Sequence, residues 1–172
     1  MKITALRKIS TVFVLVAFTT AANAQNRKDS TAIENILQEE IVSWNKKDAK
    51  MYSRHFAADG TFTNIIGMFF TGYDIFLQKH EEVFKTVFRG TSLQLKVVSI
   101  KFADAGVAVV ETISTVSGFS ADGPPRGTTL DSKGGLNTRL LQVMVRTGDD
   151  WKIIAYHNVD IKQGIPIPET AH

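Results

Sequence analysis

The chain has 172 residues and no cysteine, and its 20 lysines and arginines exceed its 17 aspartates and glutamates by three. The lack of cysteine excludes thiol catalysis and thiolate-ligated metals, although an oxidising compartment would be tolerated. Three basic residues and no acidic ones precede Gln25, so the rest of the chain carries equal numbers of both charges. Without a lysine and arginine cluster, nothing supports a nucleic acid or an anionic membrane as partner.

The first 24 residues have the order of a cleavable secretory signal peptide. Basic residues between Lys2 and Lys8 precede an apolar run from Ile9 to Phe18, and small residues follow, ending in Ala22-Asn23-Ala24. This is the order of a basic start, an apolar core and an A-x-A cleavage site. The apolar run is shorter than the roughly 20 residues that a membrane-spanning helix needs. We predict a signal peptide over residues 1–24, a periplasmic or secreted mature protein that starts at Gln25, and one domain over residues 25–172.

The first half of that domain carries the helical patterns. Apolar side chains at helical spacing predict a helix from about Ser30 to Lys46, and Asp48 can cap a second, short helix. The β-branched and aromatic run from Thr61 to Ile66 predicts a strand, followed by a brief segment from Met68 to Thr71. After Gly72, the apolar stripe between Tyr73 and Phe88 predicts a third helix.

Beyond Gly90 the pattern becomes that of strands. Four runs of 10 or 11 residues follow, namely Leu93 to Phe102, Val107 to Val116, Leu136 to Val145 and Trp151 to Ile161. The tight turn at Gly148-Asp149 indicates an antiparallel hairpin, and the long connection from Ser117 to Gly135 indicates a lid or a flexible insertion. Helices grouped early and an antiparallel meander late favour an α+β fold in which the helices cover one face of a curved sheet.

The last hairpin also suggests a partner. If Thr147 pairs with Asp150, then His157 shares one face of the sheet with Met144, and Tyr156 lies on the other face. Both faces are apolar along the middle of these strands. We therefore expect the second face to be buried as well, most simply by a second subunit in a homodimer.

Several short motifs occur in an order that resembles a known family. They are Trp44-Asn45-x-x-Asp48, Phe56-Ala57-x-Asp59-Gly60-Thr61-Phe62-x-Asn64, Gly67, Gly72, and Asp150-Trp151-Lys152-Ile153 leading to Tyr156-His157-Asn158. Through these motifs, the chain resembles the SgcJ/EcaC branch of the SnoaL-like, nuclear transport factor 2-like superfamily. The resemblance extends from about residue 30 to residue 161. The resemblance implies a cone-shaped barrel, with three N-terminal helices packed on a curved, mostly antiparallel sheet, an apolar pocket and usually a homodimer. Because this superfamily includes isomerases, dehydratases, cyclases and non-catalytic binding or assembly proteins, the pocket must decide the function.

His157 and Asn64 are the first candidates for catalysis. His157 lies in an apolar strand, and the resemblance places it near the pocket, where a neutral imidazole could act as a base or orient a ligand carbonyl. The alternative is a core histidine that hydrogen-bonds to backbone. Asn64 interrupts a β-branched strand and could stabilise a developing oxyanion, or it could be an ordinary bonded strand amide.

The remaining candidates are assigned to ligand binding, each with a structural alternative. His80 lies on the apolar stripe of the third helix, either as a core histidine or as a pocket residue. Glu111 and Arg139 lie in strands joined by the long loop, and an ion pair between them could bind a polar head group or hold the sheet together. Aromatic residues of the helices and the first strand provide pocket walls or ordinary core, namely Trp44, Tyr52, Phe62 and Phe84.

Other chemistries lack their sequence signatures. The histidines have no metal-ligand spacing, and His80-Glu81-Glu82-Val83-Phe84 misses the H-E-x-x-H pattern at its last position. No nucleophile elbow, phosphate loop or dinucleotide fingerprint occurs, so we expect no cofactor. The sequence therefore predicts a domain that binds a small apolar or aromatic molecule. It acts either as a cofactor-free acid–base enzyme or as a non-catalytic binding or dimerisation protein.

Overall fold

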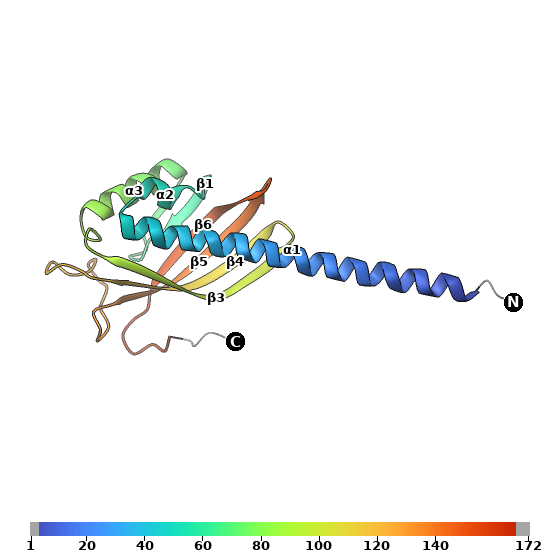
Figure 1. Cartoon of the computed structure of the whole chain (residues 1–172). Helices are drawn as coiled ribbons and strands as arrows, with labels where there is room; N and C mark the ends of the chain where they lie inside the picture. Colours follow the sequence, from blue (N-terminus) through green and yellow to red (C-terminus); the bar gives the residue numbers. More distant parts are fainter. Residues whose placement is uncertain (1–3, 168–172) are drawn as a thin grey trace.

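The structure is a computed structural model that describes the backbone of residues 4–167 and the side chains of residues 25–167. Three helices lie against one face of a curved sheet of six strands (Figure 1). The elements are α1 (Thr4–Lys46), α2 (Ala49–Ser53), β1 (Phe56–Thr63), β2 (Phe69–Thr71), α3 (Tyr73–Lys85), β3 (Ser92–Asp104), β4 (Val107–Ser117), β5 (Leu136–Thr147) and β6 (Asp150–Asp160). The predicted α+β class and element order are confirmed.

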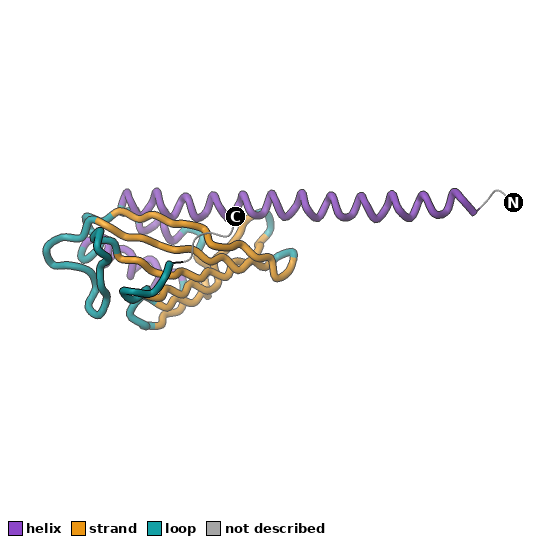
Figure 2. Tube along the Cα trace, turned by 90° about the horizontal axis from the view of Figure 1, so that it is seen from below, coloured by secondary structure: helices purple, strands orange, loops and turns teal. Residues whose placement is uncertain are grey.

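The sheet has the strand order β2-β1-β6-β5-β4-β3 and is not closed into a barrel. All neighbouring strands are antiparallel except β1 and β6, which pair in parallel. The long strands β3 to β6 run side by side beneath α1 (Figure 2). Because β1 lies next to the last strand of the chain, residues from the two ends of the domain meet on the concave face of the sheet.

Helix α1 begins much earlier than the sequence pattern predicted. It is continuous from Thr4 to Lys46, and its N-terminal part projects past the sheet (Figure 1). No glycine or proline occurs before Gly60, so nothing in this stretch interrupts a helix. Among the residues that the structure describes, no helix is both long and apolar enough to cross a membrane. The side chains of residues 1–24 lie outside the described residues, and the signal peptide stays a prediction.

The three helices are held on the sheet by their apolar sides. The C-terminal half of α1 buries Ile33, Leu37 and Trp44 against the sheet, and α3 buries Phe76 and Phe84. These side chains form one hydrophobic core with the concave side of the sheet. Burying each large apolar side chain stabilises the fold by roughly 1.5–3 kcal/mol.

A bulge in β6 reverses the predicted faces of that strand. The predicted hairpin is present, because Thr147 pairs with Asp150. Further along, Met144 pairs with Ile153 but Val143 pairs with Ala155, so Ile154 is an extra residue on β6. One extra residue moves every later side chain to the opposite face. Tyr156 is therefore buried on the concave side and His157 is exposed on the outer side, which corrects the sequence prediction.

Candidate functional site

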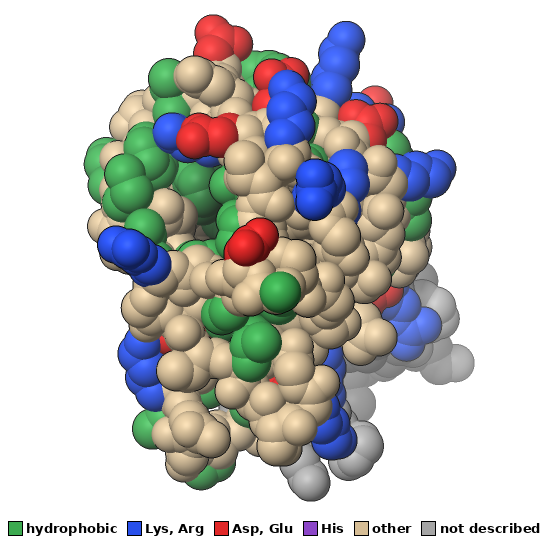
Figure 3. Space-filling model, turned by 90° about the vertical axis from the view of Figure 1, so that its left-hand side faces the viewer, with side chains coloured by type: hydrophobic (Ala, Val, Ile, Leu, Met, Phe, Trp, Pro, Cys, Tyr) green, Lys and Arg blue, Asp and Glu red, His purple; other side chains and the backbone are tan. Residues whose placement is uncertain are grey.

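A cavity of about 190 Å³ lies between the three helices and the concave face of the sheet. An apolar cavity of about 150 Å³ can hold benzene, so a molecule built on a single ring fits here. Its walls come from all three helices, from every strand and from the loop that follows β4. Hydrophobic side chains gather around a hollow at the end of the molecule where this loop lies (Figure 3). Pro125 brings the loop into the cavity wall, while Phe119 and Leu130 pack against the core.

Most of the predicted ligand-binding residues meet in this cavity, because helix stripes and strand faces converge on it. Those that line it are Trp44, Tyr52, Phe62 and His80, and Asn64, which was predicted to be catalytic, lines it as well. Phe84 does not line the cavity but lies behind its wall, with its ring edge-on to Trp44 at a centroid distance of 5.0 Å. The aromatic set predicted from the sequence is thus one cluster, partly wall and partly core.

His80 is a titratable group in the cavity wall, and its hydrogen bond and its burial together define its protonation state. It lies on α3, and its Nδ1 donates to the backbone oxygen of Phe76 over 2.8 Å, because a carbonyl oxygen can only accept. Burial lowers the pKa of His80 to about 4, although the bond to Phe76 opposes this shift. The ring is therefore neutral at pH 7, with its proton on Nδ1. Among the hydrogen bonds of residues 25–167, the ring forms only this one, so Nε2 carries a free lone pair.

Two tyrosines form the second polar feature of the cavity. The hydroxyl groups of Tyr52 from α2 and Tyr156 from β6 are 2.7 Å apart and hydrogen-bonded. Burial raises the pKa of both hydroxyls, so both keep their protons at neutral pH. The Tyr52 ring lies 4.6 Å from the ring of His80, so the hydroxyl pair and the imidazole belong to the same site. The sequence did not single out Tyr156 as a site residue, because its place depends on the bulge.

Other polar atoms complete the lining. The Thr138 hydroxyl and the Asn158 amide oxygen are buried at the cavity wall, and neither has a hydrogen-bond partner among the described residues. Buried polar groups are normally hydrogen-bonded, so these two can accept a bond from a bound molecule. Lys79 is the charged residue of the lining, and it forms an exposed ion pair with Glu82 over 3.0 Å.

Of the two predicted catalytic residues, His157 lies outside the cavity, and Asn64 lines it with its side-chain oxygen already hydrogen-bonded. His157 is exposed on the outer face of β6, opposite Leu141 of β5, and does not line the cavity. Asn64 lies at the cavity rim, but its side-chain oxygen accepts from the backbone nitrogens of Ile66 and Met68. That oxygen closes the turn between β1 and β2 and cannot also accept freely from a ligand. An oxyanion needs donors, and only the remaining amide nitrogen could serve as one.

Glu111 and Arg139 form the predicted ion pair. Both lie on the outer face of the sheet, and neither lines the cavity. The pair therefore connects β4 and β5 and has no contact with a molecule bound inside.

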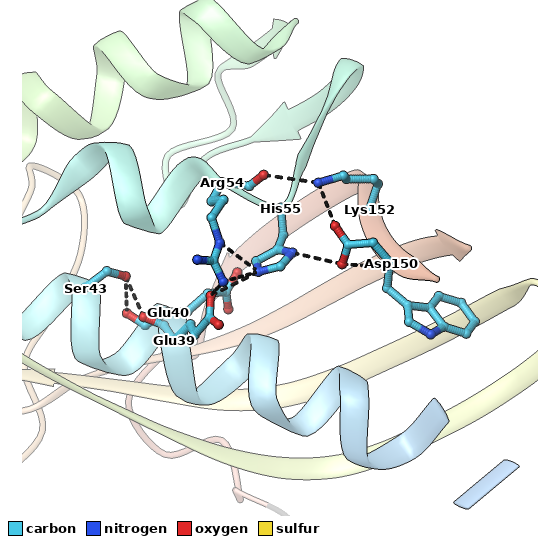
Figure 4. A network of polar contacts seen from close by, with 8 residues as sticks. Glu39, Glu40, Ser43, Arg54, His55, Asp150 and Lys152 are labelled. Atoms are coloured by element: carbon cyan, nitrogen blue, oxygen red, sulfur yellow. Dashed lines mark hydrogen bonds and ion pairs between the residues drawn. The ribbon is translucent and has the colours of Figure 1, made fainter. Parts of the chain in front are cut away.

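A separate cluster of ionisable residues lies outside the cavity, where α1 meets the start of β1 and the β5–β6 hairpin. We call it the His55 cluster. Its members are Glu39, Arg54, His55, Asp150 and Lys152 (Figure 4). The His55 ring lies between two carboxylates, with Nε2 3.0 Å from Glu39 and Nδ1 3.6 Å from Asp150. The cluster ties α1 to the start of β1 and to the hairpin of β5 and β6. Among residues 25–167, no group of acidic residues and histidines is arranged to hold a metal ion.

Comparisons with known proteins agree with this architecture. No protein-family model matches the sequence, and neither does any curated protein. Among solved structures, a putative scytalone dehydratase from Novosphingobium aromaticivorans superposes with a TM-score of 0.68 at 17% identity, over 86% of this chain and 95% of that one. A nuclear transport factor 2-like protein of unknown function from Shewanella oneidensis gives 0.62 at 16% identity, over 77% and 99%. A ketosteroid isomerase-like protein from Erwinia carotovora atroseptica gives 0.58 at 14% identity, over 77% and 95%. The fold is thus the nuclear transport factor 2-like, cystatin-like fold that the resemblance implied.

Proposed function

On this fold, we propose that the cavity binds a small, largely apolar molecule with one carbonyl group and acts on it by cofactor-free acid–base chemistry. His80 is the base, and the hydroxyl pair of Tyr52 and Tyr156 is the hydrogen-bond donor. Nε2 of His80 removes a proton from the carbon next to the carbonyl, and a tyrosine hydroxyl stabilises the charge that develops on the carbonyl oxygen. Return of the proton to another atom completes an isomerisation, and loss of a neighbouring hydroxyl completes a dehydration.

The observation that carries this proposal is the fixed tautomer of His80 in a mostly apolar wall. The bond from Nδ1 to Phe76 leaves the lone pair of Nε2 for a bound molecule. The pKa of about 4 keeps the ring neutral but makes it a weak base. Proton removal therefore depends on the hydroxyl donors, which lie in the same cavity. Two of the structural neighbours carry the names of a dehydratase and of an isomerase-like protein, and both reactions move protons.

Exchange of carbon-bound protons tests the proposal without knowledge of the natural substrate. Acetophenone carries its carbonyl on a single ring, and its methyl protons exchange with D2O when a base removes them. We expect the protein to accelerate this exchange, followed by proton NMR, and we expect His80→Gln to reduce the rate by about 10²-fold or more. His157→Gln is the matched control because this histidine is exposed, and it should keep the full rate. Equal rates in both variants would overturn the role of His80.

The weak basicity of His80 also favours a second candidate function, which is binding without catalysis. In that case the imidazole and the hydroxyl pair orient the ligand, and no proton leaves carbon. Trp44 lines the cavity, so its fluorescence reports binding of acetophenone independently of exchange. Binding that depends on His80 without any acceleration of exchange would establish this second function and reject the first.

We also propose that the protein is exported and that it dimerises through the outer face of the sheet. Export rests on the order of residues 1–24, and the protein purified from its native host should then begin at Gln25 by intact mass. Dimerisation rests on Leu141 and Val159, which are 39% and 60% exposed on the outer face. Light scattering at micromolar concentration should give twice the mass of the chain, and Val159→Lys should reduce it. The SgcJ/EcaC branch stays a prediction from the sequence motifs.

A further inference from the structure

Glu40 is a buried carboxyl group behind the cavity wall. It lies on α1, is only 3% exposed, and faces the sheet. Its Oε1 accepts a hydrogen bond of 2.7 Å from Nε2 of Gln142, which is fully buried on β5. Neither residue lines the cavity. The pair therefore lies in the core beneath the site, where an unpaired ionised carboxylate would be costly.

The pair lacks one hydrogen-bond donor. Oε2 of Glu40 and Oε1 of Gln142 are both buried without a partner among the described residues. Each is an acceptor, so the arrangement is one proton short of being satisfied. A proton on Oε2 turns that oxygen into a donor, and the acid and the amide can then form two parallel hydrogen bonds. One proton thus satisfies both oxygens.

The surroundings of Glu40 offer no positive charge that would favour the ionised form. Among the described residues, no lysine, arginine or histidine forms an ion pair with Glu40. Arg54 and His55 instead bind the neighbouring Glu39. On the cavity side, Tyr52 and Tyr156 are the groups whose pKa the charge of Glu40 raises, and the cavity lining also contains His80 and Lys79. Burial raises the pKa of Glu40 to about 8, although the bond from Gln142 lowers it in part.

Glu40 is also electrostatically coupled to the hydroxyl pair. Gln142 lies directly opposite Tyr156 on the neighbouring strand, so the acid–amide pair is next to the hydroxyl pair. Besides burial, the charge of Glu40 raises the pKa of both Tyr52 and Tyr156. The two hydroxyls have two protons, and their mutual bond uses one. The other proton can point into the cavity or toward the side of Glu40, to which neither hydroxyl is hydrogen-bonded among the described residues. An ionised Glu40 attracts it, whereas a neutral Glu40 leaves it to the cavity.

We infer that Glu40 is a positioning residue, held as a neutral acid on Gln142 so that the hydroxyl pair of Tyr52 and Tyr156 donates its free proton into the cavity. The neutral acid follows from the contacts of Glu40 alone. Only the direction of the free proton rests on the proposed function, since it requires a ligand that accepts it.

Infrared spectroscopy of the unliganded protein tests the neutral acid. At about pH 6.5 in D2O, where exposed carboxyls are ionised, we expect a carbonyl stretching band of a protonated carboxylic acid that disappears as the pH rises through about 8. Glu40→Gln should lack the band, and its amide can still donate to Gln142. Glu34→Gln, an exposed position on the same helix, should keep it. Absence of the band from the wild-type protein would overturn the inference whatever the cavity binds, and this arm requires no variant to fold.

Binding of acetophenone at different pH values tests the direction of the free proton. In the wild-type protein we expect the affinity to fall roughly three- to tenfold between about pH 6.5 and pH 9, because one hydrogen bond to the carbonyl is lost. In Glu40→Gln the affinity should not change with pH. An infrared band together with the same pH dependence in both proteins would overturn the positioning role. Failure of acetophenone to bind any variant would count against the proposed function and leave the infrared result to decide on Glu40.

Discussion

Glu39 and Glu40 are adjacent on α1, but they belong to two regions with opposite electrostatic character. Glu39 has a side chain that is 31% exposed, and it pairs with Arg54 and His55 in the His55 cluster. Glu40 is buried, and its partner is an amide. The ion pair of Glu39 and Arg54 in the first region is partly exposed to water, whereas the polar groups of the second region are kept neutral by burial.

The difference shows that two adjacent residues of one helix can lie in opposite electrostatic environments. In the cluster, each charge contributes little because water screens it. Beneath the cavity, a charge has no cation or water to stabilise it, so proton binding and folding are strongly coupled. Substitutions in the two regions should therefore differ in size and in their dependence on pH and salt.

The largest expected effect concerns Glu40. Its pKa is about 8 in the folded protein and near 4.5 when unfolded, so the stability it contributes is complete below pH 4.5 and lost as the pH rises through 8. At about 1.4 kcal/mol per pKa unit, the loss over this range is on the order of 5 kcal/mol. Urea denaturation at a series of pH values should show this fall in the wild-type protein and not in Glu40→Gln. A parallel fall in both proteins would place the titrating group elsewhere.

The second effect concerns His80 and has the opposite sign. Its folded pKa of about 4 lies below the ordinary value of 6.5, so its contribution is complete above pH 6.5 and lost as the pH falls through 4. The loss is roughly 3 kcal/mol and should be absent from His80→Gln. Between pH 4.5 and 6.5 the two slopes oppose each other, and the wild-type stability should be nearly constant. A steep dependence of the stability on pH between 4.5 and 6.5 would show that the titrations of Glu40 and His80 do not offset each other.

Tyr156→Phe should have a smaller effect that does not depend on pH. The change keeps the ring but leaves the Tyr52 hydroxyl without its bond of 2.7 Å. We expect a loss of about 1–2 kcal/mol in the free energy of unfolding, measured by urea denaturation. His157→Gln, one position further on the exposed side of the same strand, should change it by less than about 0.5 kcal/mol. If the His157 variant were the more damaging one, the bulge would be misplaced.

The smallest effect is expected for Glu39→Gln in the His55 cluster. Glu39 is partly exposed and Arg54 is more than half exposed, so their ion pair is screened. The loss should be less than about 1 kcal/mol and should shrink further in about 1 M salt. Thermal unfolding at low and high salt measures both. If Glu39→Gln lowered the free energy of unfolding as much as the substitutions of the buried residues do, the two regions would not differ in their electrostatics as we infer.

The sequence allowed the element order to be predicted because periodicity is a local property. The helices and strands follow from apolar spacing over ten or more residues, and Trp44, Tyr52, Phe62 and His80 were found through such patterns. The sequence pattern predicted a capped helix start near Ser30, but a capping residue does not prevent a helix from extending further toward the N-terminus. No glycine or proline in the preceding residues interrupts α1, so it begins at Thr4. Local spacing carries no such information about what comes before.

The parts of the site that depend on pairing across strands were not predictable in the same way. His157 was preferred to Tyr156 because the strand was read without the extra residue Ile154, which only the register to β5 reveals. Glu40 does carry a local signal, since it lies four residues after the buried Ile36, on the side of α1 that faces the sheet. Its partner Gln142 is 102 residues away, and no spacing rule connects the two.

The bulge at Ile154 makes β6 a strand with two alternative site residues. The phenol of Tyr156 and the imidazole of His157 are neighbours in sequence, and the extra residue determines which of them faces the ligand. A regular β6 in which Ile154 pairs with Val143 would turn His157 to the concave face and exchange a hydrogen-bond donor for a base, whereas the bulge keeps Tyr156 there. The pairing of one residue outside the cavity lining therefore decides which chemical group β6 presents to a ligand, without any substitution in the site.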